Sequence, residues 1–219
     1  MHTALGSDRL SLSVVERVRS QLIAYALYGD WYDYVYELWK TALAQIGFGE
    51  VDISFSGFSS QGDGASFTAP LLDIGLLMDF FTTKITPKNC IEPTGRLGEE
   101  EDFWPYLTAT LGADACYFPQ FASLRPYAAE WAGAVVRVDR HYVHAHTCET
   151  ELTDWPEELM APAGVVAAFR AAVEQVRVSL CLAIYKSLED EHDSLVTEDA
   201  LVERDANNAR AWDVRGRQE

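Results

Sequence analysis

Residues 51–67 read VDISFSGFSSQGDGASF. Apolar and polar residues alternate at the start of this stretch, which is typical of a half-buried β-strand. The Gly62-Asp63-Gly64 turn supplies the positive φ angles that a tight reversal of the chain needs. We therefore predict that Val51–Phe58 and Ala65–Thr68 pair as antiparallel strands around a structural loop. The aromatic residues expected to be buried in this hairpin are Phe55 and Phe67.

Apolar residues recur at helical spacing in several segments on either side of the hairpin. In Gly164–Leu188 the apolar stripe runs the full length of the segment, which makes it the clearest helix of the chain. In Trp31–Ile46 the stripe is aromatic, and such a stripe is typical of a core face. The predicted helices are Ser11–Tyr28, Trp31–Ile46, Leu71–Ile85, Glu101–Leu111, Gly164–Leu188 and Thr197–Asn207.

A second hairpin is predicted from two β-rich segments, Ala134–Asp139 and Tyr142–Leu152. Two hairpins flanked by helices indicate an α+β fold: an antiparallel sheet of about four strands, helices packed against it and a long C-terminal helix. The chain length of 219 residues fits one domain over residues 1–219, with flexible tails at 1–8 and 208–219.

The formal net charge is −17, and this excess of carboxylates repels nucleic acid phosphates. Direct binding of DNA or RNA is therefore not expected, whereas a basic protein surface would be attracted. No apolar run approaches the roughly 18 residues of a membrane helix, and no signal peptide is visible. The cysteines lack any Cys-x-x-Cys pairing and suggest free thiols in a reducing cytoplasm: Cys90, Cys116, Cys148 and Cys181.

Acidic residues gather at both ends of the predicted long helix. Carboxylates spread along such an edge would imitate the charge spacing of a phosphate backbone and compete for Lys/Arg grooves. A solvated face that only keeps the protein soluble is the alternative interpretation. The candidate partner-binding residues are Glu149, Glu151, Asp154, Glu157, Glu158, Glu189, Asp190, Glu191, Asp193, Glu198 and Asp199.

A possible metal site is the run His144, His146 and Cys148, whose side chains would share one face of a strand. Same-face neighbours on a strand lie about 7 Å apart, however, which is awkward for a single ion. A polar strand face with hydrogen-bonded histidines is the alternative, and we expect no bound metal or cofactor. The chain also lacks a Walker A loop and a Gly-x-Ser-x-Gly elbow, so the sequence does not favour an enzyme.

Three segments carry a resemblance to a known family: Trp31–Glu37 with the hairpin that follows, His141–His144, and Ile184–His192. Around the hairpin, with its motif FSGFxSQGDGAxF, the chain resembles a family of mostly uncharacterised proteins from bacteriophages and other mobile elements. The resemblance implies a mobile-element origin, and the family offers no catalytic residues to transfer.

These observations predict an accessory protein of a phage or mobile element that acts by binding a basic, nucleic-acid-binding host protein. The most concrete form is an anti-CRISPR-like inhibitor that occupies a nucleic-acid channel. One alternative is an antitoxin-like regulatory partner of a basic protein. Another is a small metal-dependent hydrolase that uses His144, His146 and Cys148. The oligomeric state is left open.

Overall fold

The computed structural model describes residues 12–80, 125–127, 135–139, 151–153 and 162–207. Contacts within the chain divide it into two compact units, and each is described by itself. The first unit comprises residues 1–33 and 189–219, and the second comprises residues 34–188. The predicted single domain over residues 1–219 stays a prediction.

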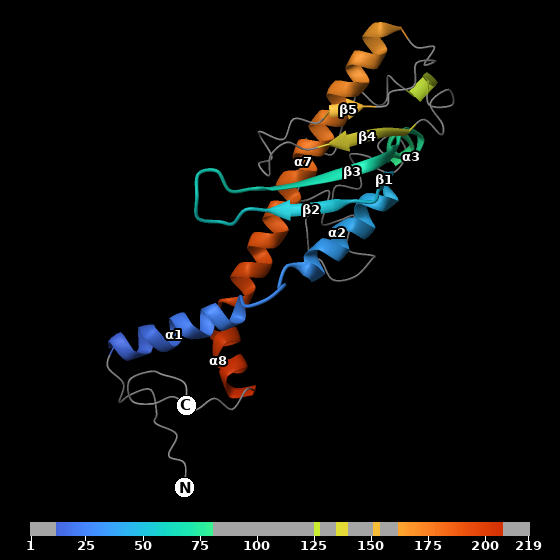
Figure 1. Cartoon of the computed structure of the whole chain (residues 1–219). Helices are drawn as coiled ribbons and strands as arrows, with labels where there is room; N and C mark the ends of the chain where they lie inside the picture. The colour runs from blue at the N-terminus through green and yellow to red at the C-terminus, as the bar shows by residue number, and fades with distance from the viewer. Residues whose placement is uncertain (1–11, 81–124, 128–134, 140–150, 154–161, 208–219) are drawn as a thin grey trace, which may run out of the picture. The chain divides into compact units, whose positions relative to one another are not determined.

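The second unit contains an antiparallel sheet built around one long strand, β3 (Figure 1). β1 and β2 each pair with β3, β4 also pairs with it, and β5 pairs with β4. The strands are β1 (Phe48–Gly49), β2 (Asp52–Phe55), β3 (Ala65–Asp73), β4 (Val135–Asp139) and β5 (Glu151–Thr153). Together with the helices this arrangement confirms the predicted α+β class.

The first predicted hairpin is confirmed, with shorter strands than expected. β2 pairs with the start of β3 from Asp52 opposite Thr68 to Phe55 opposite Ala65. Phe67 is buried and packs edge-to-face against Phe48, at a ring-centroid distance of 5.2 Å. The predicted burial of Phe55 was wrong, because this residue ends β2 and is only partly buried.

The loop between the two strands is held by its own side chains, as predicted. The Asp63 carboxylate accepts hydrogen bonds from the backbone N–H groups of Ser59 and Ser60, both at 2.6 Å. Ser56 Oγ accepts another from the Gly64 N–H at 3.1 Å. Because these polar groups satisfy the loop's own backbone, the loop is structural.

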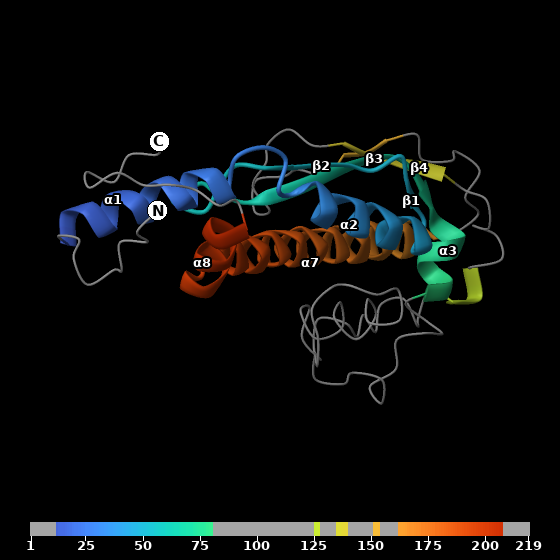
Figure 2. The same ribbon diagram turned by 90° about the horizontal axis from the view of Figure 1, so that it is seen from below.

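Two helices cover one face of the sheet, α2 (Asp33–Gln45) and α7 (Ala163–Leu195), as Figure 2 shows. The Trp39 indole N–H donates to Ser187 Oγ at 3.0 Å, and both side chains are buried. This bond satisfies the polar edge of a large buried ring, which would otherwise be left without a partner in the core. The two predicted helices are confirmed, and α7 extends beyond the predicted Leu188.

The prediction of one helix over Leu71–Ile85 was wrong at its start. Leu71 to Asp73 continue β3, because Leu72 pairs with Phe48 and with Val136 of the neighbouring strands. Helix α3 begins only at Ile74 and ends at Asp79. Asp73 caps it, accepting the Leu76 N–H at 3.0 Å, and this polar cap marks the change from strand to helix. Residues 81–85 lie outside the described part of the chain.

The second predicted hairpin is confirmed in its pairing: β4 pairs antiparallel with β5, Arg137 opposite Thr153. β5 covers Glu151–Thr153, whereas the predicted strand ran from Tyr142 to Leu152, and residues 140–150 lie outside the described ranges. The predicted helix Glu101–Leu111 also lies outside them, and the short 3-10 helix η3 covers Arg125–Tyr127.

The first unit contains α1 (Leu12–Ala26), the last residues of α7 and α8 (Glu198–Asn207). Its described core is small: Leu22 and Ala26 of α1 pack with Leu201 of α8. Thr197 precedes α8 and accepts the Ala200 N–H at 3.4 Å, as expected of an N-cap residue. Both predicted helices of this unit are confirmed.

Gly47, just after the end of α2, is a position with little room for a side chain. Its φ is 101°, and an added Cβ would lie 2.6 Å from the backbone oxygen of Asp73. We expect Gly47→Ala to lower the free energy of unfolding by about 1 to 3 kcal/mol through the backbone conformation alone. Urea denaturation measures this. Gly164→Ala is the control: its Cβ would meet nothing within 4 Å, so it should leave stability unchanged or raise it.

Candidate protein-binding surface

The first unit contains six of the acidic residues that the sequence singled out. Asp190 and Asp193 lie near the end of α7 and are exposed. Glu198 and Asp199, also exposed, form the first turn of α8, where negative charge suits the positive end of the helix dipole. Glu189 and Glu191, on the same stretch of α7, are half-buried. The end of α7 and the start of α8 therefore form one acidic segment, which we call the α7–α8 acidic segment.

The remaining predicted acids are not part of this segment. Glu151 is the first residue of β5 and belongs to the second unit. Glu149, Asp154, Glu157 and Glu158 lie outside the described residues. In the sequence these acids lie before the long helix, and the α7–α8 acidic segment lies at its C-terminal end. Of these two acidic groups, only the C-terminal one lies fully within the described residues.

Aromatic side chains lie beside the acidic segment. The Trp31 ring meets the His192 ring edge-on at a centroid distance of 5.8 Å, and Trp31 also meets Tyr32 at 5.7 Å. His192 Nδ1 in turn lies 3.1 Å from the Asp193 carboxylate. The Trp31 ring and the Asp193 carboxylate therefore lie around His192, within the acidic segment.

Tyr32 is held by the carboxylate that precedes it. Its hydroxyl donates to Asp30 Oδ1 at 3.2 Å. This hydrogen bond, together with the negative charge of Asp30, raises the pKa of Tyr32 above its ordinary value. Tyr32 therefore stays a neutral hydrogen-bond donor throughout the physiological range.

Two further tyrosines are exposed on the first unit, and the sequence analysis missed them. Tyr25 of α1 has 54% of its surface exposed, and Tyr28 in the turn after α1 has 86%. The spacing gave no signal for Tyr25, because it lies seven residues after Val18 and three after Leu22 and so borders the apolar face of the helix. Tyr28 follows the end of the helix, where exposure could have been expected. Exposed Tyr residues are typical contact residues of protein interfaces.

The possible metal site cannot be placed, because His144, His146 and Cys148 lie outside the described residues. Within the ranges that are described, no group of His, Cys, Asp and Glu is arranged to hold a metal ion. Cys181 is a free and buried thiol. None of the described helices is both long and apolar enough to span a membrane.

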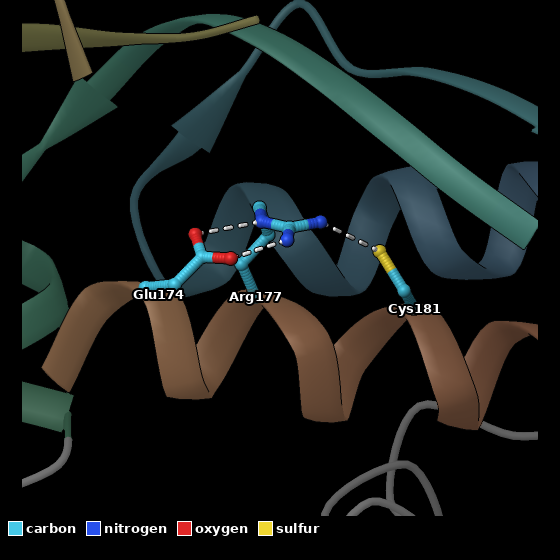
Figure 3. A network of polar contacts seen from close by, with 3 residues as sticks. All are labelled: Glu174, Arg177 and Cys181. Atoms are coloured by element: carbon cyan, nitrogen blue, oxygen red, sulfur yellow. Dashed lines mark hydrogen bonds and ion pairs between the residues drawn. The ribbon is translucent and has the colours of Figure 1, made fainter. Parts of the chain in front are cut away.

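A buried arginine is the other polar feature that the sequence analysis missed (Figure 3). Arg177 of α7 is only 2% exposed, and its guanidinium donates to both carboxylate oxygens of Glu174, at 3.0 Å and 2.5 Å. On its other side Arg177 donates to the Cys181 sulfur at 3.7 Å. These residues are three and four positions apart, so one face of α7 presents them together. Because the guanidinium is buried, we assign the network to folding and not to partner binding.

The Glu174–Arg177 pair should be important for stability. Glu174→Ala would leave a buried guanidinium without its carboxylate, so we expect a loss of about 1.5 to 3 kcal/mol in the free energy of unfolding. Glu37→Ala is the matched control: it removes an ion pair with Lys40 of the same i, i+3 spacing, but the two side chains are 71% and 38% exposed. That change should cost less than about 0.5 kcal/mol. Urea denaturation measures both changes. Equal losses in the free energy of unfolding would contradict the assignment of the Arg177 network to folding.

Comparison with known proteins identifies one partial family match. Residues 31–79 match a family model described as a domain of unknown function (DUF8835). The matched region runs from Trp31 through α2, the first hairpin and α3, and it ends before α7. No curated protein and no solved structure matches the chain. The match therefore covers α2, the first hairpin and α3, and it assigns no function to this chain.

Proposed function

We propose that this chain acts by binding a basic surface of another protein through its α7–α8 acidic segment. The observation that carries the proposal is the exposure of Asp190, Asp193, Glu198 and Asp199 on two consecutive helices of one unit. Exposed carboxylates contribute little to stability, so their concentration here is better explained by a contact with positive charge than by folding.

The partner that best fits this surface is a nucleic-acid-binding protein. Its Lys/Arg groove is built to accept regularly spaced negative charge, which successive turns of an acidic helix also present. The acidic segment would therefore compete with nucleic acid for the groove. Combined with the resemblance to proteins of bacteriophages and mobile elements, this supports an anti-CRISPR-like inhibitor of a host defence complex, acting in the host cytoplasm.

Salt should weaken the complex strongly. Attraction between the −17 chain and a basic groove acts over a Debye length of about 8 Å at physiological ionic strength. A partner isolated from host lysate should therefore bind more slowly as salt rises from about 50 to about 200 mM, with little change in the dissociation rate. Surface plasmon resonance measures both rates. Nucleic acid should displace the chain from this partner. An affinity that does not change with salt concentration would contradict the proposal.

Charge reversal should identify the acidic segment as the contact. Asp190→Lys/Asp193→Lys changes two exposed side chains, and we expect it to weaken binding at least about tenfold, or roughly 1.4 kcal/mol, through the on-rate. The control Asp52→Lys/Asp79→Lys makes the same change in net charge at two exposed positions of the second unit. If both variants lost the same affinity for the partner, binding would depend only on the net charge of the chain. Thermal unfolding should be nearly unchanged in both variants.

A further inference from the structure

The exposed tyrosines of the first unit bear on what kind of basic surface the acidic segment would meet. Tyr25 and Tyr28 present 54% and 86% of their surfaces to solvent. Both lie on or directly after α1, the helix that packs through Leu22 and Ala26 against Leu201 of α8. The same unit therefore displays aromatic rings and carboxylates, two groups that favour positive charge by different means.

We propose that the partner surface is rich in arginine, with guanidinium groups stacking on Tyr25 and Tyr28 while neighbouring guanidiniums pair with the α7–α8 acidic segment. This inference rests on the proposed function and narrows it. A carboxylate pairs with either cation, and it pairs with arginine through a bidentate fork. An aromatic ring adds a preference for arginine of its own, because the flat and weakly hydrated guanidinium stacks on it while an ammonium keeps its water.

The residues that follow α1 lie beside the acidic segment. The Trp31 ring meets the His192 ring edge-on at 5.8 Å, and His192 Nδ1 lies 3.1 Å from the Asp193 carboxylate. An incoming guanidinium would meet aromatic rings and carboxylates on this unit, the Tyr25 and Tyr28 rings and the carboxylates of α7 and α8.

The rings themselves make this surface suitable for a stable contact. A tyrosine has only two side-chain torsions to order, so it gives a large contact area at a small loss of conformational entropy. At an exposed site each cation–π contact is expected to contribute about 0.5 to 1 kcal/mol. An ammonium also makes cation–π contacts, so the two rings would add at most roughly 5- to 30-fold to the preference for arginine over lysine.

The test uses the full chain and fluorescent arginine and lysine homopeptides of equal length, with affinity measured by fluorescence anisotropy at low salt. We expect the arginine peptide to bind more tightly, with the two rings adding at most roughly 5- to 30-fold to this preference. Tyr25→Leu/Tyr28→Leu should remove the part of the preference that the rings supply, because leucine keeps apolar surface but removes the ring. Tyr25→Phe/Tyr28→Phe should retain it, since the ring alone stacks.

Tyr34→Leu is the matched control, since Tyr34 is 53% exposed but belongs to the second unit. It should leave the preference unchanged, and circular dichroism checks that each variant folds. If the preference is undiminished in the Tyr25→Leu/Tyr28→Leu variant, the arginine inference is wrong. The proposed function still holds in that case, provided that binding falls with salt and with Asp190→Lys/Asp193→Lys. If neither peptide binds at low salt, both proposals fail.

Discussion

The close approach of Gly47 to Asp73 is the constraint on which the second unit depends. The Asp73 N–H donates to the Gly47 carbonyl at 2.8 Å, and the Asp73 carbonyl fills the space that a Cβ on Gly47 would take. Gly47 follows the end of α2, while Asp73 ends β3 and caps α3. One backbone contact therefore sets how a helix, a strand and a second helix meet. β1, which begins one residue after Gly47, pairs with the end of β3 beside this contact.

Much of this fold could be predicted from the sequence because its signals are local. The first hairpin and the apolar period of α7 need no knowledge of distant residues, and both elements are confirmed. The positive φ that was expected in the Gly62-Asp63-Gly64 turn lies instead at Gly57, where φ is 122°. Leu71 and Leu72 read as helix because their apolar surroundings suit a buried helix as well as a strand. The pairing of Leu72 with Phe48 and Val136 decided in favour of the strand, and such partners are not visible in a local window. Phe55 was expected in the core for a similar reason: alternation gives the face of a strand but not where the core ends.

The candidate surface was only partly predictable. The charge of −17 identified an acidic protein, and the run from Glu189 to Asp199 identified its most acidic described segment. What the sequence could not show is that this run shares a unit with α1, because the contact of Leu22 and Ala26 with Leu201 joins residues at opposite ends of the chain. Arg177 was missed because a charge inside an apolar stripe looks like an exposed position. Its pairing with Glu174 and its contact with the Cys181 sulfur help to accommodate it inside the core.

The two units differ in which of their described side chains are buried and which are exposed. The second unit buries large side chains such as Trp39, Phe48, Phe67 and Phe169, and it satisfies the polar groups among them, as in the bond from Trp39 to Ser187. In the first unit the described buried cluster consists of Leu22, Ala26 and Leu201, while Asp190, Asp193, Glu198, Asp199, Tyr25 and Tyr28 are exposed. Exposed carboxylates contribute little to folding, whereas a basic surface that approached them would lower their mutual repulsion. This difference is the physical reason for proposing the first unit as the binding surface.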